Sequence, residues 1–256
     1  MKKINILHTE WSTDWGGQEL RILSESLALR DTYGAKVLLA TRDGAVLGQK
    51  ASEAGLIEAR VFEPNKYDKN KVRDELGIPR SAVCVGSMGL FREVKRLDIF
   101  LNIALSIHKT HPNTHFLLVG SGDTESFVRD FISMQEMSEF VTLLPFSPAK
   151  MLSAMDIFML TSSSEGVPQT LMQALFMQKA CIATNVGSVR DLFFKDNFLL
   201  YGCDENQLKS ALKLLLEHPQ MLENLSLNKQ EFVRANFSLE KMASDVYGAE
   251  ILGSRE

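Results

Sequence analysis

The sequence predicts an α/β protein built on a doubly wound parallel sheet. Short apolar runs alternate with amphipathic helical patterns along most of the chain, as in repeated β-α units. The runs are apolar throughout rather than at every second residue, which is typical of strands that helices cover on both faces. A hydrophobic share of 45% and a charged share of 23% suit the core and the surface of an ordinary globular protein.

The amino-terminal part of the chain predicts a β-α-β-α segment. Apolar runs at 4–7 and 36–40 predict two strands, and the leucine spacing between them predicts an amphipathic helix over 18–30. A second helix is predicted over 45–54, followed by a short strand near Val61. A piece of about 60 residues buries little surface by itself, so we expect this segment to pack on the rest of the chain or to extend its sheet.

A polar stretch over 63–71 contains the first proline of the chain and reads as a linker. The alternation of strands and helices restarts beyond it. Six further strands are predicted, at residues 82–88, 115–119, 140–144, 157–161, 180–184 and 198–201. Helical patterns fill the gaps, and three helices close the chain from Gln207 onward. We therefore predict a truncated amino-terminal lobe over residues 1–65 and a complete α/β domain over residues 66–256.

Composition excludes several classes of protein. A net charge of −4 gives no reason to expect a nucleic-acid partner, because such proteins present a basic face. The cysteines, Cys84, Cys181 and Cys203, are scattered and odd in number, which favours buried free thiols in a reducing compartment. His8 and Glu10 interrupt what would be the apolar part of a signal peptide, and no run approaches the length of a membrane span. We expect a cytoplasmic protein.

The turn after the predicted strand 157–161 carries a single acid, Glu165, at the edge where ligands bind in open α/β sheets. Gly166 allows a tight turn, and Pro168 suits the first position of the helix that follows. The helix end would present three backbone N–H groups, those of Val167, Gln169 and Thr170. Such an end favours anions.

Glu165 and Gln173 are candidate ligands for a molecule rich in hydroxyl groups. Gln173 lies eight residues beyond Glu165, roughly two helical turns along, and both side chains accept hydrogen bonds from hydroxyls. The alternative is that Glu165 is a solvated loop acid and Gln173 a surface residue of the helix.

Two cations, Arg92 and Lys95, follow the predicted strand 82–88 at the same edge of the sheet. Together with the helix dipole they would balance the charge of a diphosphate without a metal ion, and the chain has no Asp-x-Asp pair to hold one. The alternative is that these residues form a solvated basic loop. His108, His111 and His115 do not share one face, so structural or solvated roles are expected for them rather than metal binding.

Three further segments end strands and offer weaker signals. The glycine turn at Gly120 and Gly122 allows close approach to a phosphate or base, and Phe146 offers a wall for a nucleotide base or belongs to the core. The paired glycines Gly16 and Gly17 follow the first strand and allow the backbone to approach a ligand, although a plain strand-helix turn has the same sequence.

Taken together, these motifs resemble the GT-B glycosyltransferases of family 4, the group 1 glycosyltransferases. The resemblance covers nearly the whole chain and rests on an ordered set of segments. These are Asp14–Glu19, Gly89–Asp98, Phe116–Gly122, Glu165–Ala174 and Ala183–Arg190.

The resemblance implies a nucleotide-diphospho-sugar donor held mainly by a Rossmann-like carboxyl-terminal domain. Arg92 and Lys95 would neutralise the diphosphate and the charge that develops on the leaving group. Glu165 would hold the hydroxyls of the donor sugar, and Gln173 would stand where the family has an acid that binds the ribose. The resemblance further implies retention of anomeric configuration, no metal and no cofactor. The implied acceptor is a saccharide or a lipid-linked intermediate of lipopolysaccharide or capsule synthesis at the inner membrane face.

Two departures from the family pattern keep other functions open. Gln173 brings no charge, and the amino-terminal lobe passes from about Ala59 directly to the predicted linker, without the segment that contributes acceptor-binding loops. A second hypothesis is therefore an inactive relative, or a donor-binding half whose acceptor side is a partner chain. A third is a nucleotide-sugar epimerase, for which the sequence offers no catalytic acid pair.

Overall fold

The computed structural model describes residues 5–10, 16–33, 36–41, 46, 50, 67–145, 148–166, 168–192, 199–201, 204–226 and 233. The chain divides into two compact units, one made of Met1–Val61 and Glu231–Glu256 and the other of Phe62–Gln230. The predicted domain ranges, 1–65 and 66–256, stay predictions. The assignment of the last residues to the carboxyl-terminal domain stays a prediction, because most of them lie outside the described residues.

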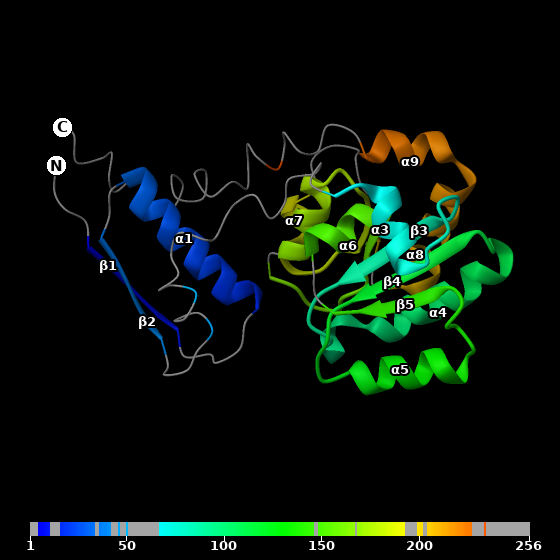
Figure 1. Ribbon diagram of the computed structural model, residues 1–256, viewed down its shortest axis with the longest axis horizontal. Coiled ribbons are helices and arrows are strands. Elements are labelled where there is room, and N and C mark those ends of the chain that lie inside the picture. Colours follow the sequence, from blue (N-terminus) through cyan, green and yellow to red (C-terminus); the bar gives the residue numbers. More distant parts are fainter. Residues whose placement is uncertain are drawn as a thin grey trace. The chain divides into compact units, whose positions relative to one another are not determined.

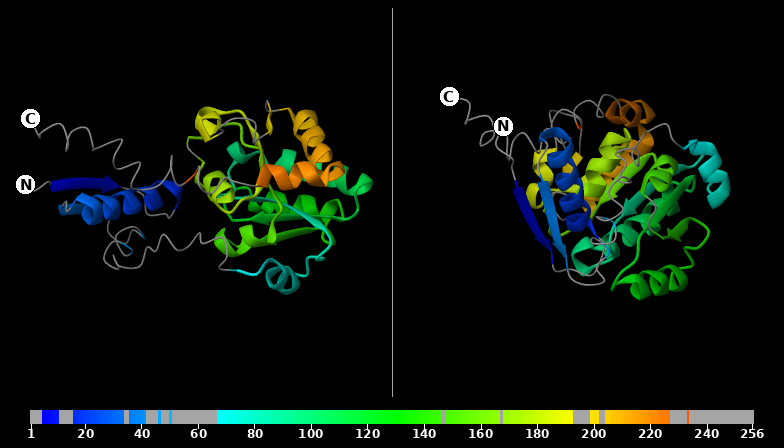
Figure 2. Two further views of the ribbon diagram at one scale, coloured as in Figure 1. Left: turned by 90° about the horizontal axis from the view of Figure 1, so that it is seen from above. Right: turned by 60° about the vertical axis from the view of Figure 1, so that its left-hand side comes forward.

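The first unit contains a β-α-β arrangement (Figures 1 and 2). Strands β1 (Asn5–Glu10) and β2 (Lys36–Thr41) pair in parallel, with Asn5 opposite Lys36. Helix α1 (Gly17–Tyr33) connects them, because parallel neighbours need a crossover. These elements confirm the first three predicted ones. The predicted helix over 45–54 and the strand near Val61 fall largely outside the described residues.

The second unit is built on a six-stranded sheet in which every neighbouring pair is parallel. Its strands are β3 (Val83–Met88), β4 (Thr114–Val119), β5 (Val141–Leu144), β6 (Ile157–Leu160), β7 (Ala180–Thr184) and β8 (Leu199–Tyr201). All six were predicted, and each observed end lies within one residue of the predicted one. The spatial order is β5-β4-β3-β6-β7-β8, so the chain winds outward in one direction and then returns to place β6 beside β3. The predicted doubly wound fold is confirmed.

Two sets of helices cover the two faces of this sheet (Figure 1). One set packs around α4 and on β4 and β7, and consists of α4 (Leu97–Thr110), α5 (Glu125–Met134), α8 (Glu205–Glu217) and α9 (Pro219–Ser226). The other packs on β3, β6 and β7, and consists of α3 (Lys69–Leu76), α6 (Pro148–Ala154) and α7 (Gln169–Phe176). Since both faces are covered, β4, β6 and β7 are buried at every residue, as their apolar runs predicted.

The core under α4 is dense and aromatic. Phe100 of α4 meets Phe116 of β4 edge to face, with ring centroids 5.9 Å apart. Ile103 and Ile107 extend the buried stripe of α4 at helical spacing. This packing fixes the helix that follows the candidate cation loop, and so fixes one wall of the site.

The predicted linker over 63–71 is wrong at its carboxyl end, because α3 begins at Lys69. Asp68 is the N-cap residue, and its side chain accepts a hydrogen bond from the Lys71 N–H at 2.8 Å. The polar, lysine-rich composition of this segment led to its interpretation as a linker. The helix is anchored by one long side chain, Arg73.

Arg73 ties α3 to the amino ends of β3 and β6. Its guanidinium, 1% exposed, donates to the carbonyls of Ala154 at 2.9 Å and Ala82 at 2.9 Å and to the Asp156 carboxylate at 2.6 Å. Asp156 also accepts from the Cys84 N–H at 2.8 Å and pairs with Lys69. Burial opposes the charge of Asp156, but the cations Lys69 and Arg73 outweigh it and hold the pKa of this carboxyl below its usual range. This cluster is structural and lies at the edge of the sheet opposite the candidate site.

Two histidines and two cysteines of this unit contact the core or are buried in it. His108 stacks on Phe140 with ring centroids 3.8 Å apart, and His115 Nε2 lies 2.8 Å from Thr142 Oγ1. Cys84 and Cys181 are buried free thiols, as predicted, whereas Cys203 lies outside the described residues. Within the described ranges, no helix has both the length and the apolar character that crossing a membrane requires.

Candidate functional site

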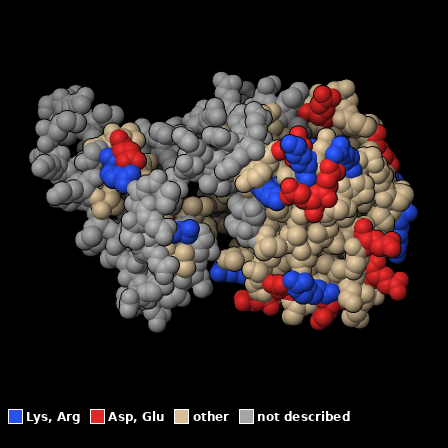
Figure 3. Space-filling view, viewed as in Figure 1, with Lys and Arg blue, Asp and Glu red and all other residues tan. Residues whose placement is uncertain are grey.

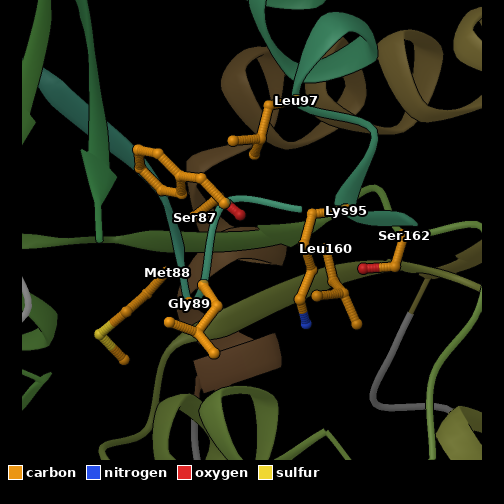
Figure 4. A pocket seen from close by; sticks show the side chains of 9 residues that line it. Ser87, Met88, Gly89, Lys95, Leu97, Leu160 and Ser162 are labelled. Atoms are coloured by element: carbon orange, nitrogen blue, oxygen red, sulfur yellow. The ribbon is translucent and has the colours of Figure 1, made fainter. Parts of the chain in front are cut away.

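A small pocket opens where the winding of the sheet reverses, between the carboxyl ends of β3 and β6 (Figure 4). Its lining comes from the end of β3, the loop that follows, the start of α4 and the end of β6. The residues are Ser87, Met88, Gly89, Leu90, Phe91, Lys95, Leu97, Leu160 and Ser162. Ligands of open α/β sheets bind at this switch point, so the pocket lies at the edge where the sequence predicted a site.

Lys95 and Glu165 form an ion pair at this edge. The Lys95 Nζ donates to Glu165 Oε1 at 2.6 Å, and the two side chains are 20% and 10% exposed. Lys95 ends the short 3-10 helix η2 (Glu93–Lys95), and Glu165 lies on the loop before α7. The fold thus joins two predicted site residues that are 70 positions apart in the sequence. The alternative that Glu165 is a solvated loop acid is wrong, because the carboxylate is largely buried and paired.

A buried hydroxyl supports the same carboxylate. Ser162, 0% exposed, donates its hydroxyl to Glu165 Oε1 at 2.6 Å. In Figure 4 the hydroxyl oxygen of Ser162 turns toward Lys95 and Leu160. The carbonyl of Ser162 in turn accepts from Thr184 Oγ1 at 2.6 Å.

The cation loop is fastened to the end of β6 through its backbone. Thr161 Oγ1 donates to the carbonyl of Lys95 at 2.8 Å, and the Ser163 N–H donates to the carbonyl of Val94 at 2.8 Å. Sequence reasoning missed Thr161, Ser162 and Thr184. The only available signal was that polar residues follow directly on fully apolar strands, where a buried hydroxyl needs a partner.

The backbone of Glu165 lies against the loop that follows β7. Gly187, the first residue of η3 (Gly187–Leu192), has φ +52°, and a Cβ atom there would lie 1.7 Å from the carbonyl oxygen of Glu165. Only glycine permits this contact, so Gly187 sets the position of the Glu165 loop.

Arg92 is not brought together with the pair. Its side chain is exposed, does not line the pocket and forms no ion pair with the residues that the structure describes. Its backbone caps η2, with the Lys95 N–H donating to the Arg92 carbonyl at 2.9 Å. Arg92 therefore lies at the rim of the loop whose last residue, Lys95, reaches the pocket.

The start of α7 differs from the prediction by one residue. Pro168 is the N-cap rather than the first helical residue, because its φ of −72° and ψ of 102° are extended. Its carbonyl accepts from the N–H groups of Leu171 at 3.1 Å and Met172 at 3.2 Å. Gln169 and Thr170 form the half-buried first turn, Gly166 is exposed, and Val167 lies outside the described residues.

Gln173 is buried rather than on the helix surface, so that alternative is wrong. Its side chain is 9% exposed, and its Oε1 has no hydrogen-bond partner among the described residues. A buried acceptor without a donor is unfavourable in the free protein, which makes this oxygen a candidate for a ligand hydroxyl.

The glycine turn after β4 shapes the loop after β3. Gly120 and Gly122 have φ near +150°, and Cβ atoms there would lie 1.9 Å from the Gly89 carbonyl oxygen and 2.6 Å from the Phe91 carbonyl oxygen. The Phe91 N–H donates to the Ser121 carbonyl at 2.8 Å. The two turns are therefore in close backbone contact. Direct contact of Gly120 and Gly122 with a donor stays a prediction.

The predicted contributions of Gly16, Gly17 and Phe146 to donor binding stay predictions. Gly16 and Gly17 belong to the first unit, where the Gly16 N–H donates to Glu19 Oε2 at 2.9 Å and Gly17 begins α1. Phe146 lies outside the described residues.

Surface charge gives no further site on the face that Figure 3 shows. Lysine, arginine and acidic side chains lie next to one another on the described part of that face rather than in patches of one sign. Ion pairs such as Arg80 with Asp74 and Lys150 with Glu75 also bring opposite charges together in the described part of the chain.

Comparison with known proteins found a family model and curated relatives that match this chain. A family model described as "Glycosyl transferases group 1" matches residues 68–232. TuaC of Bacillus subtilis (strain 168), named for teichuronic acid biosynthesis, is 29% identical over 197 residues, covering 75% of this chain and 48% of that protein. The N-acetyl-alpha-D-glucosaminyl L-malate synthase of Bacillus anthracis is 24% identical over 192 residues, covering 73% of this chain and 50% of that protein. The chain spans about half the length of these relatives.

Solved structures show the same fold. HepE of Anabaena, in complex with UDP-glucose, superposes with a TM-score of 0.74 at 15% identity, over 98% of this chain and 100% of that one. The carboxyl-terminal domain of LpcC from Francisella tularensis superposes with a TM-score of 0.62 at 19% identity, over 71% of this chain and 98% of that one.

Proposed function

Because this chain belongs to the glycosyl transferases group 1, we propose that it transfers a sugar from a nucleotide-diphospho-sugar to an acceptor. The family match covers residues 68–232, which include the whole switch-point pocket. The proposed transfer retains anomeric configuration and needs neither a metal nor a cofactor. The proposed acceptor is a saccharide or lipid-linked intermediate of a cell-envelope polysaccharide or lipopolysaccharide. The names of relatives from teichuronic acid and O-antigen synthesis support this choice.

The observation that carries the proposal is the Lys95–Glu165 pair at the edge of the pocket. A cation and a carboxylate held side by side match the two chemistries of a nucleotide-sugar, namely a diphosphate and a ring of hydroxyls. In the proposed mode, Lys95 contacts the diphosphate and stabilises the charge on the leaving nucleoside diphosphate. Glu165 accepts hydrogen bonds from the sugar hydroxyls. Arg92, on its exposed stem, supplies a second cation at the rim.

The remaining contacts follow from the elements around this pair. The first turn of α7, with Gln169 and Thr170 after Gly166 and Pro168, turns its positive end toward the phosphates. The unpaired Oε1 of Gln173 accepts from the ribose of the donor. The structure of HepE with UDP-glucose supports a uridine diphosphate sugar as the first donor to test.

The proposed location is the cytoplasm, with peripheral contact at the inner membrane for a lipid-linked acceptor. A partner chain that supplies the acceptor side is the second candidate arrangement, in which this chain binds the donor without turning it over. No nucleic acid is expected, given the net charge of −4.

A panel of UDP-glucose, UDP-N-acetylglucosamine, GDP-mannose and ADP-glucose tests donor binding, first by thermal shift and then by calorimetry. A ligand that binds the native state raises the apparent stability. Release of free nucleoside diphosphate, measured with and without cell extract and with and without EDTA, then separates transfer from binding alone. Wild-type protein that binds none of these donors and releases none of the diphosphates contradicts the proposal.

Lys95→Ala and Glu165→Ala should each weaken donor binding or activity by well over tenfold, which is more than about 1.4 kcal/mol. Lys109→Ala and Glu139→Ala are matched controls, because both side chains are exposed and outside the pocket. Wild-type affinity and activity in both site variants would remove the site assignment while leaving the family membership intact.

A further inference from the structure

Among the residues that the structure describes, the partners of the Glu165 carboxylate contact one of its two oxygens. Oε1 accepts from Lys95 Nζ and from Ser162 Oγ, each at 2.6 Å. Oε2 has no hydrogen-bond partner among the residues that the structure describes. The carboxylate therefore has a fixed orientation and one acceptor oxygen left for a ligand.

The two donors to Oε1 differ in how firmly they are held. Ser162 is 0% exposed, and its carbonyl accepts from Thr184 Oγ1 at 2.6 Å; Thr184 is also 0% exposed. Lys95 carries its charge on a flexible four-carbon stem and is 20% exposed at the pocket. Ser162 is thus held close to Glu165 by burial and by the hydrogen bond to its backbone, whereas Lys95 can turn toward an incoming anion.

We infer that Ser162 is a positioning residue, which holds the Glu165 carboxylate toward the donor sugar when Lys95 turns to the diphosphate. The inference rests on the proposed function and extends it. Without Ser162, engagement of Lys95 by phosphate would leave Glu165 with no donor in the described part of the chain. Thr184 acts indirectly, because its hydroxyl holds the Ser162 backbone through the hydrogen bond to the Ser162 carbonyl. The diphosphate contact depends on Lys95 and does not require Ser162.

This division of roles predicts a selective loss. In Ser162→Ala, the affinity for the best nucleotide-sugar of the panel should fall about tenfold, as expected for one hydrogen bond to a charged group. The affinity for its parent nucleoside diphosphate should stay within about twofold. Lys95→Ala should weaken the binding of both ligands. Thr184→Val, which keeps the shape and removes the hydroxyl, should show the same selective loss as Ser162→Ala at smaller size.

The test is calorimetric titration of each variant with that nucleotide-sugar and with its parent diphosphate, alongside thermal unfolding. Ser164→Ala is the matched control, since the Ser164 side chain is exposed and donates no hydrogen bond to the Glu165 carboxylate in the described part of the chain. The positioning role alone is overturned if Ser162→Ala keeps its unfolding temperature and loses affinity for both ligands equally, or for neither. If Ser162→Ala does not fold, the affinities of Thr184→Val for the same two ligands test the positioning role. Wild type that binds no ligand of the panel overturns the proposed function instead.

Discussion

Replacement of Gly187 by alanine should disable donor binding by moving the Glu165 loop. Two costs arise from the structure. At φ +52° a side chain adds left-handed strain of about 1–2 kcal/mol. In addition, the new Cβ would lie 1.7 Å from the Glu165 carbonyl oxygen, whereas real Cβ atoms essentially never come closer than 3.0 Å. The loop of Glu165 or the start of η3 must therefore shift by more than 1 Å. Misplacement of a binding group by about 1 Å can lower activity roughly 100-fold.

Gly77→Ala separates the strain from the displacement. Gly77 also has a left-handed φ, +69°, but no atom lies within 4 Å of the position that a methyl group would take, and the residue ends α3 away from the pocket. Both variants should lose about 1–2 kcal/mol of unfolding free energy from strain. Only Gly187→Ala should also lose affinity for the nucleotide-sugar, measured by calorimetry. If Gly187→Ala binds the donor as tightly as Gly77→Ala does, the contact with Glu165 does not position the site.

Two predictions concern the scaffold. Arg73→Met should lower the unfolding free energy by about 3–5 kcal/mol, because it leaves the Asp156 carboxylate and backbone carbonyls short of donors. Arg80→Met, which breaks an exposed pair with Asp74, should leave the unfolding free energy close to the wild-type value. Equal losses for the two variants in denaturant titrations would show that the contacts of Arg73 stabilise the fold no more than an exposed ion pair does. Burial lowers the pKa of His115 to about 4, so the unfolded state binds the proton first and stability should be full above about pH 6.5 and fall progressively toward pH 4. His115→Gln should flatten this part of the stability profile, and an unchanged slope would assign it to other groups.

The buried strands were predictable because their signal is local. A globular protein exposes few short apolar runs with turn residues at their ends, so each such run predicts a buried strand. The predicted ends of β3 to β8 lie within one residue of the observed ones. The boundary of α3 was not predictable in this way. Its surface is polar and lysine-rich, and the contact that anchors it joins Arg73 to Asp156, 83 residues further along the chain.

The residues of the candidate site and the edge of the sheet where they lie were largely predictable, but the contacts between these residues were not. The positions of Lys95 and Glu165 after neighbouring strands indicated one edge of the sheet, and the family resemblance, confirmed by the match over residues 68–232, supplied their expected roles. No pattern indicated that Arg92 would lie at the rim. None indicated that Gln173 would be buried, since a glutamine at helical spacing fits a wet face equally well.

The sequence by itself determined the order of the strands, the apolar core and the loops that carry charge, because each follows from residues close together in the chain. Only the tertiary structure decided which of those loops meet. The hydroxyls of Ser162 and Thr184, the carboxylate of Glu165 and the backbone of Gly187 come from separate segments of the chain. Their contacts exist because parallel strands bring their carboxyl ends to one edge, where distances of 2.6 Å depend on packing throughout the sheet.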